Sequence, residues 1–101
     1  MVMIKVHKAY RRIVAVSDPD LLGKKFVEGK MQIDVNKDFF SGEEFNEDET
    51  MEILKAEVAE DSTFNFVGKK AVEVGKKVGI IGKNKEAVII VKGIPAALSL
   101  L

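Results

Sequence analysis

Alternating apolar and polar positions predict strands at the start of the chain. Apolar and polar side chains alternate over residues 2–8, and residues 12–17 form a second strand-like run after a short turn. This spacing predicts an opening hairpin. Two further strand-like pieces, Lys25–Val27 and Met31–Val35, are separated by a short break that contains Gly29.

A compact helical turn is predicted between these two pairs of strands. Asp18 can cap the turn, Pro19 suits its first helical position, and Gly23 can end it in a left-handed conformation.

The clearest helix begins after Asn46. Glu49 follows three residues later, in a pattern close to a capping box. Met51, Leu54 and Val58 recur at helical spacing, so we expect these three side chains to face the core. The acidic side of this helix is interpreted either as solvated surface or as a partner site.

A second helix is predicted from Gly68 to about Gly79, after a short extended or turn segment at residues 63–67. At about 100° per residue one face of this helix carries charge and the other is apolar. Gly75 lies on the apolar side, where we expect it to allow close packing. The charged face consists of Lys69, Lys70, Glu73, Lys76 and Lys77.

The end of the chain is strongly apolar. Residues 87–93 contain a continuous apolar run, which favours a central, buried strand. Pro95 is expected to end strand pairing after Ile94. The tail Ala96–Leu101 is expected to pack on the domain or on a second subunit, which predicts a homodimer through the C-terminal tail.

Together these elements predict a single domain over residues 1–101. Its fold class is α+β: a two-layer sandwich of a small, mostly antiparallel sheet with two main helices and a short helical turn.

Composition narrows the class of protein. The chain has 101 residues, 47% of them hydrophobic and 32% charged, with no cysteine and one histidine. These values are typical of a folded domain and leave no disulfide framework or histidine-rich metal site. No stretch approaches the roughly 20 apolar residues of a membrane span. We therefore expect a cytoplasmic protein without a cofactor, a metal or a membrane partner.

The net charge of zero hides an uneven distribution. Residues 1–33 carry seven basic and three acidic side chains, residues 34–61 carry two and eleven, and residues 62–101 carry seven and two. Folding either mixes these charges over the surface or produces one basic face suited to polyanions.

The repeated Gly-Lys-Lys at residues 68–70 and 75–77 does not match a nucleotide-binding loop. That motif needs an earlier glycine and a serine or threonine after the lysine. In the first register these positions are Thr63 and Lys70, and in the second they are Lys70 and Lys77.

Basic clusters are the candidate binding residues, since lysine and arginine contact phosphates regardless of sequence. An aromatic side chain beside two arginines at a hairpin tip can also stack on a base. Amides at the helix start near Gly68 would add an anion contact. Each cluster is also consistent with ordinary solvated surface, which is the commoner explanation of such residues. The candidate nucleic-acid-binding residues are Tyr10, Arg11, Arg12, Lys24, Lys25, Gly68, Lys69, Lys70, Lys76 and Lys77.

The chain contains, in order, the segments DLLGKKFVEGKMQIDV, FNFVGKKAVEVGKKVG and the closing VIIVKGIPAA. Taken together, these segments resemble a small archaeal family catalogued as domain of unknown function number 424. The resemblance implies a two-layer α+β fold, an archaeal cytosolic origin and a loose assignment as an RNA-binding protein connected with translation. The family commonly has a histidine after the final proline, where this chain has Ala96.

The leading hypothesis is therefore an RNA-binding or translation-associated module. The alternative is a protein-interaction or self-associating domain that uses the apolar tail or the acidic helix. We expect no enzymatic activity, because His7 has no evident catalytic partner and the carboxylates fit caps and exposed helix faces better than an acid–base pair.

Overall fold

The computed structural model describes residues 1–82 and 88–100, and its main element is a six-stranded sheet. The strands are β1 (Val2–His7), β2 (Ile13–Ser17), β3 (Lys25–Glu28), β4 (Met31–Asp34), β5 (Glu43–Phe45), β6 (Thr63–Val67), β7 (Ile89–Val91) and β8 (Ile94–Leu100). The helical elements are η1 (Pro19–Leu21), α1 (Lys37–Phe40), α2 (Glu47–Ala59) and α3 (Lys69–Lys77).

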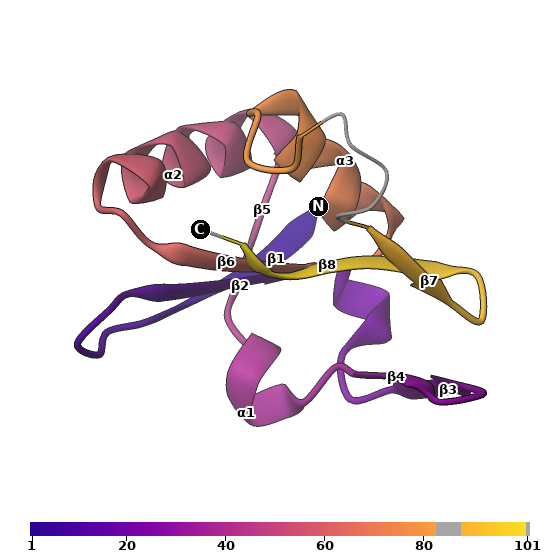
Figure 1. Ribbon diagram of the computed structural model, residues 1–101. Coiled ribbons are helices and arrows are strands. Elements are labelled where there is room, and N and C mark those ends of the chain that lie inside the picture. Colours follow the sequence, from indigo (N-terminus) through magenta and orange to yellow (C-terminus); the bar gives the residue numbers. More distant parts are fainter. Residues whose placement is uncertain (83–87, 101) are drawn as a thin grey trace.

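The sheet has the order β5-β1-β2-β6-β8-β7, and β3 and β4 form a separate two-stranded sheet. The β2–β6 pair is parallel, whereas the other pairs of the main sheet are antiparallel. Helices α2 and α3 cover one face of the sheet, and α1 and the β3–β4 hairpin lie on the other (Figure 1). The predicted α+β fold with a mostly antiparallel sheet is confirmed.

Side chains from the two faces of the sheet build two cores. Val14, Val16 and Phe66 pack in the core on the helical side together with Leu54 of α2. Ala15 lies in the second core, which α1 and the β3–β4 hairpin help to form on the other face of the sheet. Alternation along β2 is the reason that one strand serves both cores.

Strand β6 is more central than the sequence indicated. The segment was expected to be a short extended or turn segment, but it lies between β2 and β8 in the middle of the sheet. Phe64 and Phe66 face the helices, and Val67 faces the other core. A five-residue segment gives a weak sequence signal, because its buried partners come from distant parts of the chain.

The prediction for the end of the chain was wrong in two respects. Strand β7 lies at the edge of the sheet, not at its centre, and its Ile90 is 60% exposed. Pro95 does not end pairing, because it lies within β8 opposite Ile90. The connecting turn has positive φ at Lys92 and Gly93, as in two-residue hairpins, and places Ile90 and Pro95 in a pair without cross-strand hydrogen bonds. The missing proline N–H therefore costs no bond to β7.

Helix α2 begins as predicted, but the face that it buries against the core differs from the predicted one. The capping box between Asn46 and Glu49 is present. Leu54 is fully buried as expected, whereas Val58 is 51% exposed and Glu57 is buried in its place. Hydrophobic spacing predicted that Val58 faces the core. It could not predict the burial of Glu57, because a glutamate is not expected to be buried unless it is paired.

Candidate nucleic-acid interface

The hairpin between β1 and β2 ends in a basic tip, which we define as residues 8–11. The tip extends past the end of the sheet, away from β7 (Figure 1). Tyr10 is fully exposed, at 110% of its reference area. Lys8 and Arg11 beside it are also exposed. An aromatic ring and two cations are therefore presented together to solvent.

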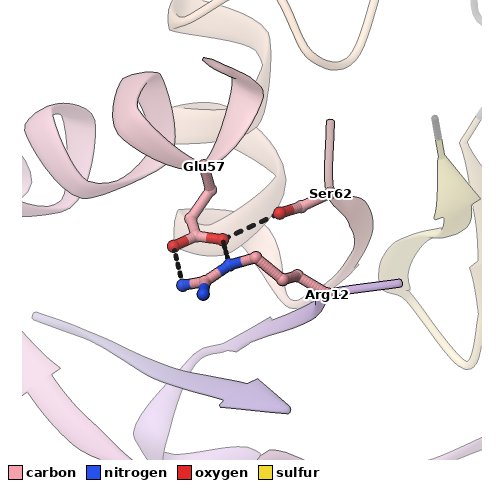
Figure 2. Close-up of polar contacts among 3 residues, drawn as sticks. All are labelled: Arg12, Glu57 and Ser62. Carbon is pink, nitrogen blue, oxygen red and sulfur yellow. Dashed lines mark hydrogen bonds and ion pairs between the residues drawn. The ribbon is translucent and has the colours of Figure 1, made fainter. Parts of the chain in front are cut away.

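Arg12, which was also predicted as a phosphate contact, is less exposed than these residues and is bound to Glu57. Its Nε and Nη2 atoms donate to the two carboxylate oxygens of Glu57 at 3.0 and 2.7 Å. Ser62 Oγ donates to the same carboxylate at 2.8 Å. Figure 2 shows the carboxylate of Glu57 held between these two partners. The guanidinium is thus engaged within the fold, in the two-point geometry that makes such pairs strong.

The same network changes the acidity of Glu57. Hydrogen bonding from Arg12 lowers the pKa of the carboxyl group, burial opposes this, and the bond from Ser62 lowers the pKa further. The carboxylate is therefore the form that the fold stabilises.

His7 anchors the other arm of the hairpin. Its Nε2 lies 2.8 Å from the carbonyl oxygen of Phe39, and the two rings stack with centroids 4.9 Å apart. His7 is paired with Ile13 across the hairpin. Since the backbone amide of Thr63 also donates to the Arg12 carbonyl at 2.9 Å, the base of the tip is held on both arms. His7 has a structural role here.

The start of α3 does not offer the anion contact predicted at Gly68. Gly68 is buried, and its amide donates to the Pro95 carbonyl at 2.9 Å. The next amides, of Lys70 and Ala71, donate to the carboxylate of Asp18 at 3.2 and 2.9 Å. A carboxylate of the chain itself thus occupies the positive end of the helix and would repel a phosphate.

This arrangement also corrects the predicted role of Asp18. Asp18 precedes η1, but its side chain makes no capping bond to that turn. It caps α3 instead. Sequence spacing could not reveal this, because Asp18 and Ala71 are 53 residues apart.

The lysines of α3 lie on its exposed face, as the helical periodicity predicted. Lys69, Lys70 and Lys76 are exposed, and Lys77 forms ion pairs with Glu47 and Glu73. The pair with Glu47 raises the pKa of Lys77. The apolar face is also confirmed: a Cβ on Gly75 would lie 2.8 Å from Ile81 Cδ1.

The basic clusters do not form one face. Lys24 and Lys25 are exposed at the start of β3, on the opposite side of the sheet from α3 (Figure 1). The start of α3 follows the carboxyl end of β6, whereas the tip precedes β2, which runs parallel to β6. The tip and the α3 start therefore lie at opposite ends of the sheet. Of the two readings of the charge distribution, the structure supports mixing over the surface.

Sequence reasoning missed Lys8 and Glu57. Lys8 stands beside the cluster that was singled out, so its position in the turn was a usable signal. Glu57 occurs in an acidic helix, where the sequence gives no sign that one carboxylate is buried and paired with Arg12.

The apolar C-terminal segment is partly buried within the sheet, whereas Leu98 is 42% exposed. Ala96 and Ala97 are buried within β8. Leu101 lies outside the described residues.

Neither a cluster of metal ligands nor a membrane-spanning helix occurs in the described part of the chain. Among residues 1–82 and 88–100, no three His, Cys, Asp or Glu side chains gather as metal ligands would. None of the helices described here is long and apolar enough to cross a membrane.

Comparison with known proteins gives a family and a fold. No curated protein matches the sequence. The crystal structure of an uncharacterized conserved protein from Methanopyrus kandleri is similar, with a TM-score of 0.80, 20% identity, and coverage of 95% of this chain and 87% of that one. The model of the family described as "Protein of unknown function (DUF424)" matches residues 7–100. Because this match covers nearly the whole sequence, the chain belongs to the DUF424 family.

Proposed function

We propose that this protein is a small cytoplasmic RNA-binding module, not an enzyme, and that the tip is its main contact surface. One observation carries the proposal: the fully exposed Tyr10 stands between two exposed basic residues, Lys8 and Arg11. Aromatic and cationic side chains in this combination are typical of surfaces that bind nucleic acid.

The basic side chains of the tip can contact phosphates without breaking a strong interaction within the protein. Within residues 1–82 and 88–100, Arg11 forms one ion pair, to Asp61 at 3.6 Å, and the Asp61 side chain is 87% exposed. An exposed pair of this kind contributes little to stability, so a phosphate can replace the carboxylate at small cost. Arg12, by contrast, supports the tip through its bonds to Glu57.

The family resemblance directs the choice of RNA. It implies a connection with translation, so transfer RNA and ribosomal RNA are the first RNAs to test. The structure itself favours no particular sequence, because phosphate contacts carry no sequence information.

The test is the affinity of the purified protein for labelled RNA, measured by fluorescence anisotropy at low salt. Arg11→Glu replaces a phosphate contact with a repulsive charge. We expect it to weaken binding by roughly tenfold or more.

Lys69→Glu is the matched control. It makes the same change in net charge at the start of α3, at the opposite end of the sheet, and we expect a much smaller effect. Equal losses in the two variants would show that overall charge, and not the tip, governs binding. Failure of the wild-type protein to bind any RNA would exclude the proposed function.

A second candidate, self-association, is favoured by the edge strand β7. The pairing of β7 with β8 directs the N–H and C=O of Ile90 away from β8, and the Ile90 side chain is exposed. A two-fold axis at Ile90 would place Ile89 opposite Val91 of a second copy and Val88 opposite Lys92. Like charges would therefore not meet, and the strand itself carries no charge or proline to prevent such pairing.

Self-association is tested by the mass in solution, measured by light scattering. A dimeric wild-type chain that becomes monomeric on Ile90→Lys would support the second candidate. A monomeric wild-type chain would exclude it. Deleting the C-terminal segment is a poor test, because it removes β8 from between β6 and β7.

A further inference from the structure

We infer that the tip selects single-stranded RNA and does so by stacking an unpaired base on the ring of Tyr10. This inference rests on the proposed function and adds the class of RNA. It begins with the exposure of Tyr10, at 110% of the reference area. A ring so exposed adds no burial to the core, so its position at the tip is not explained by folding.

The shape of the tip favours an unpaired base. In an RNA duplex the base faces are covered by their neighbours, the major groove is too deep and narrow for side chains, and the minor groove displays hydroxyl groups and base edges. A single exposed ring can offer only its face. That face fits a base in a loop, at an end or in a single strand.

The neighbours of Tyr10 provide the remaining contacts. Lys8 and Arg11 are exposed on either side of the ring in the sequence. A base on the ring would bring its own phosphates close to these cations, since the backbone of a single strand follows its bases. Stacking and phosphate contacts can therefore be made by one nucleotide and its neighbours.

Side-chain contacts on both faces of the sheet hold the base of the tip in place. His7 is bonded to Phe39 on one side of the sheet, and Arg12 is bonded to Glu57 on the other. A platform held in this way loses less conformational entropy on binding than a free loop would. Arg12 and Glu57 thus act as positioning residues.

The chain provides its own probe for the experiment. Tyr10 is its one tyrosine, and it has no tryptophan. Intrinsic tyrosine fluorescence therefore reports on the tip alone. Single-stranded oligouridylate and an RNA duplex of equal length are titrated into the protein, with free tyrosine amide as the control for light absorbed by the RNA.

We expect the single strand to quench Tyr10 fluorescence beyond the free-tyrosine control, and the duplex not to do so. Tyr10→Ala should weaken single-strand binding by roughly 5- to 150-fold, the range for loss of one stacked base. Tyr10→Phe, which keeps the ring face, should stay within about threefold of wild type in an anisotropy assay.

Two results would overturn the inference, and they differ in what they say of the proposed function. Equal binding of single strand and duplex, with no fluorescence change but with weakening by Arg11→Glu, would reject stacking and keep the proposed function. Absence of binding to both RNAs would reject the two together.

Discussion

At the scale of single residues, the contact between Gly68 and Asp18 determines how α3 starts. Gly68 has a φ of 110°, and a Cβ at this position would lie 2.4 Å from the carboxylate carbon of Asp18. The sequence indicated that a glycine precedes the helix. The sequence could not indicate why a glycine is needed there, because the reason is the side chain of Asp18, 50 positions earlier. The Asp18 carboxylate occupies the place at the helix start where a phosphate was expected.

Gly68→Ala is therefore predicted to destabilise the protein strongly. The left-handed backbone and the displaced cap together should cost about 3 kcal/mol of unfolding free energy. Urea unfolding measures this loss.

Gly79→Ala is the control, because Gly79 also has a positive φ, of 82°, but has nothing within 4 Å of its Cβ position. It should cost only about 1 kcal/mol. Equal losses for the two variants would show that the contact with Asp18 adds nothing.

At the scale of elements, the bonds from Arg12 to Glu57 and from Ser62 to Glu57 tie the β1–β2 hairpin to α2 and to the residue before β6. Sequence analysis predicted the hairpin and the start of α2 correctly, since both depend on neighbouring residues. It did not predict how they join. That joint depends on a buried carboxylate and an arginine 45 positions apart.

The hydrogen bonds to Glu57 make the free energy of unfolding depend on pH. Because the pKa of Glu57 is lowered in the folded state, chiefly by the bond from Arg12, its contribution is present above the unfolded pKa of about 4.3. The contribution is lost as the pH falls through the folded pKa. We predict that the unfolding free energy of the wild-type chain falls over this acidic range, and that Glu57→Gln removes this part of the fall.

Urea unfolding across a pH series tests this prediction. Glu52→Gln, an exposed site on the same helix, should leave the wild-type pH profile almost unchanged. Parallel profiles for wild type and Glu57→Gln would contradict a linkage through this carboxylate.

At the scale of the whole molecule, sixteen basic and sixteen acidic side chains balance, and local arrangement decides where a polyanion can bind. The sequence identified the basic clusters but not their relation in space. Folding pairs Arg12 and Lys77 with glutamates, separates α3 from Lys24 and Lys25, and leaves the tip with an exposed aromatic ring. These outcomes depend on tertiary contacts, which local sequence patterns do not contain.

The salt dependence of RNA binding tests the central claim most directly. Each phosphate contact with single-stranded RNA contributes about 0.7 to the slope of log K against log salt concentration. If Lys8 and Arg11 contact phosphates, replacing both with alanine should reduce the magnitude of that slope by about 1.4. An unchanged slope in the double variant would contradict binding through the tip.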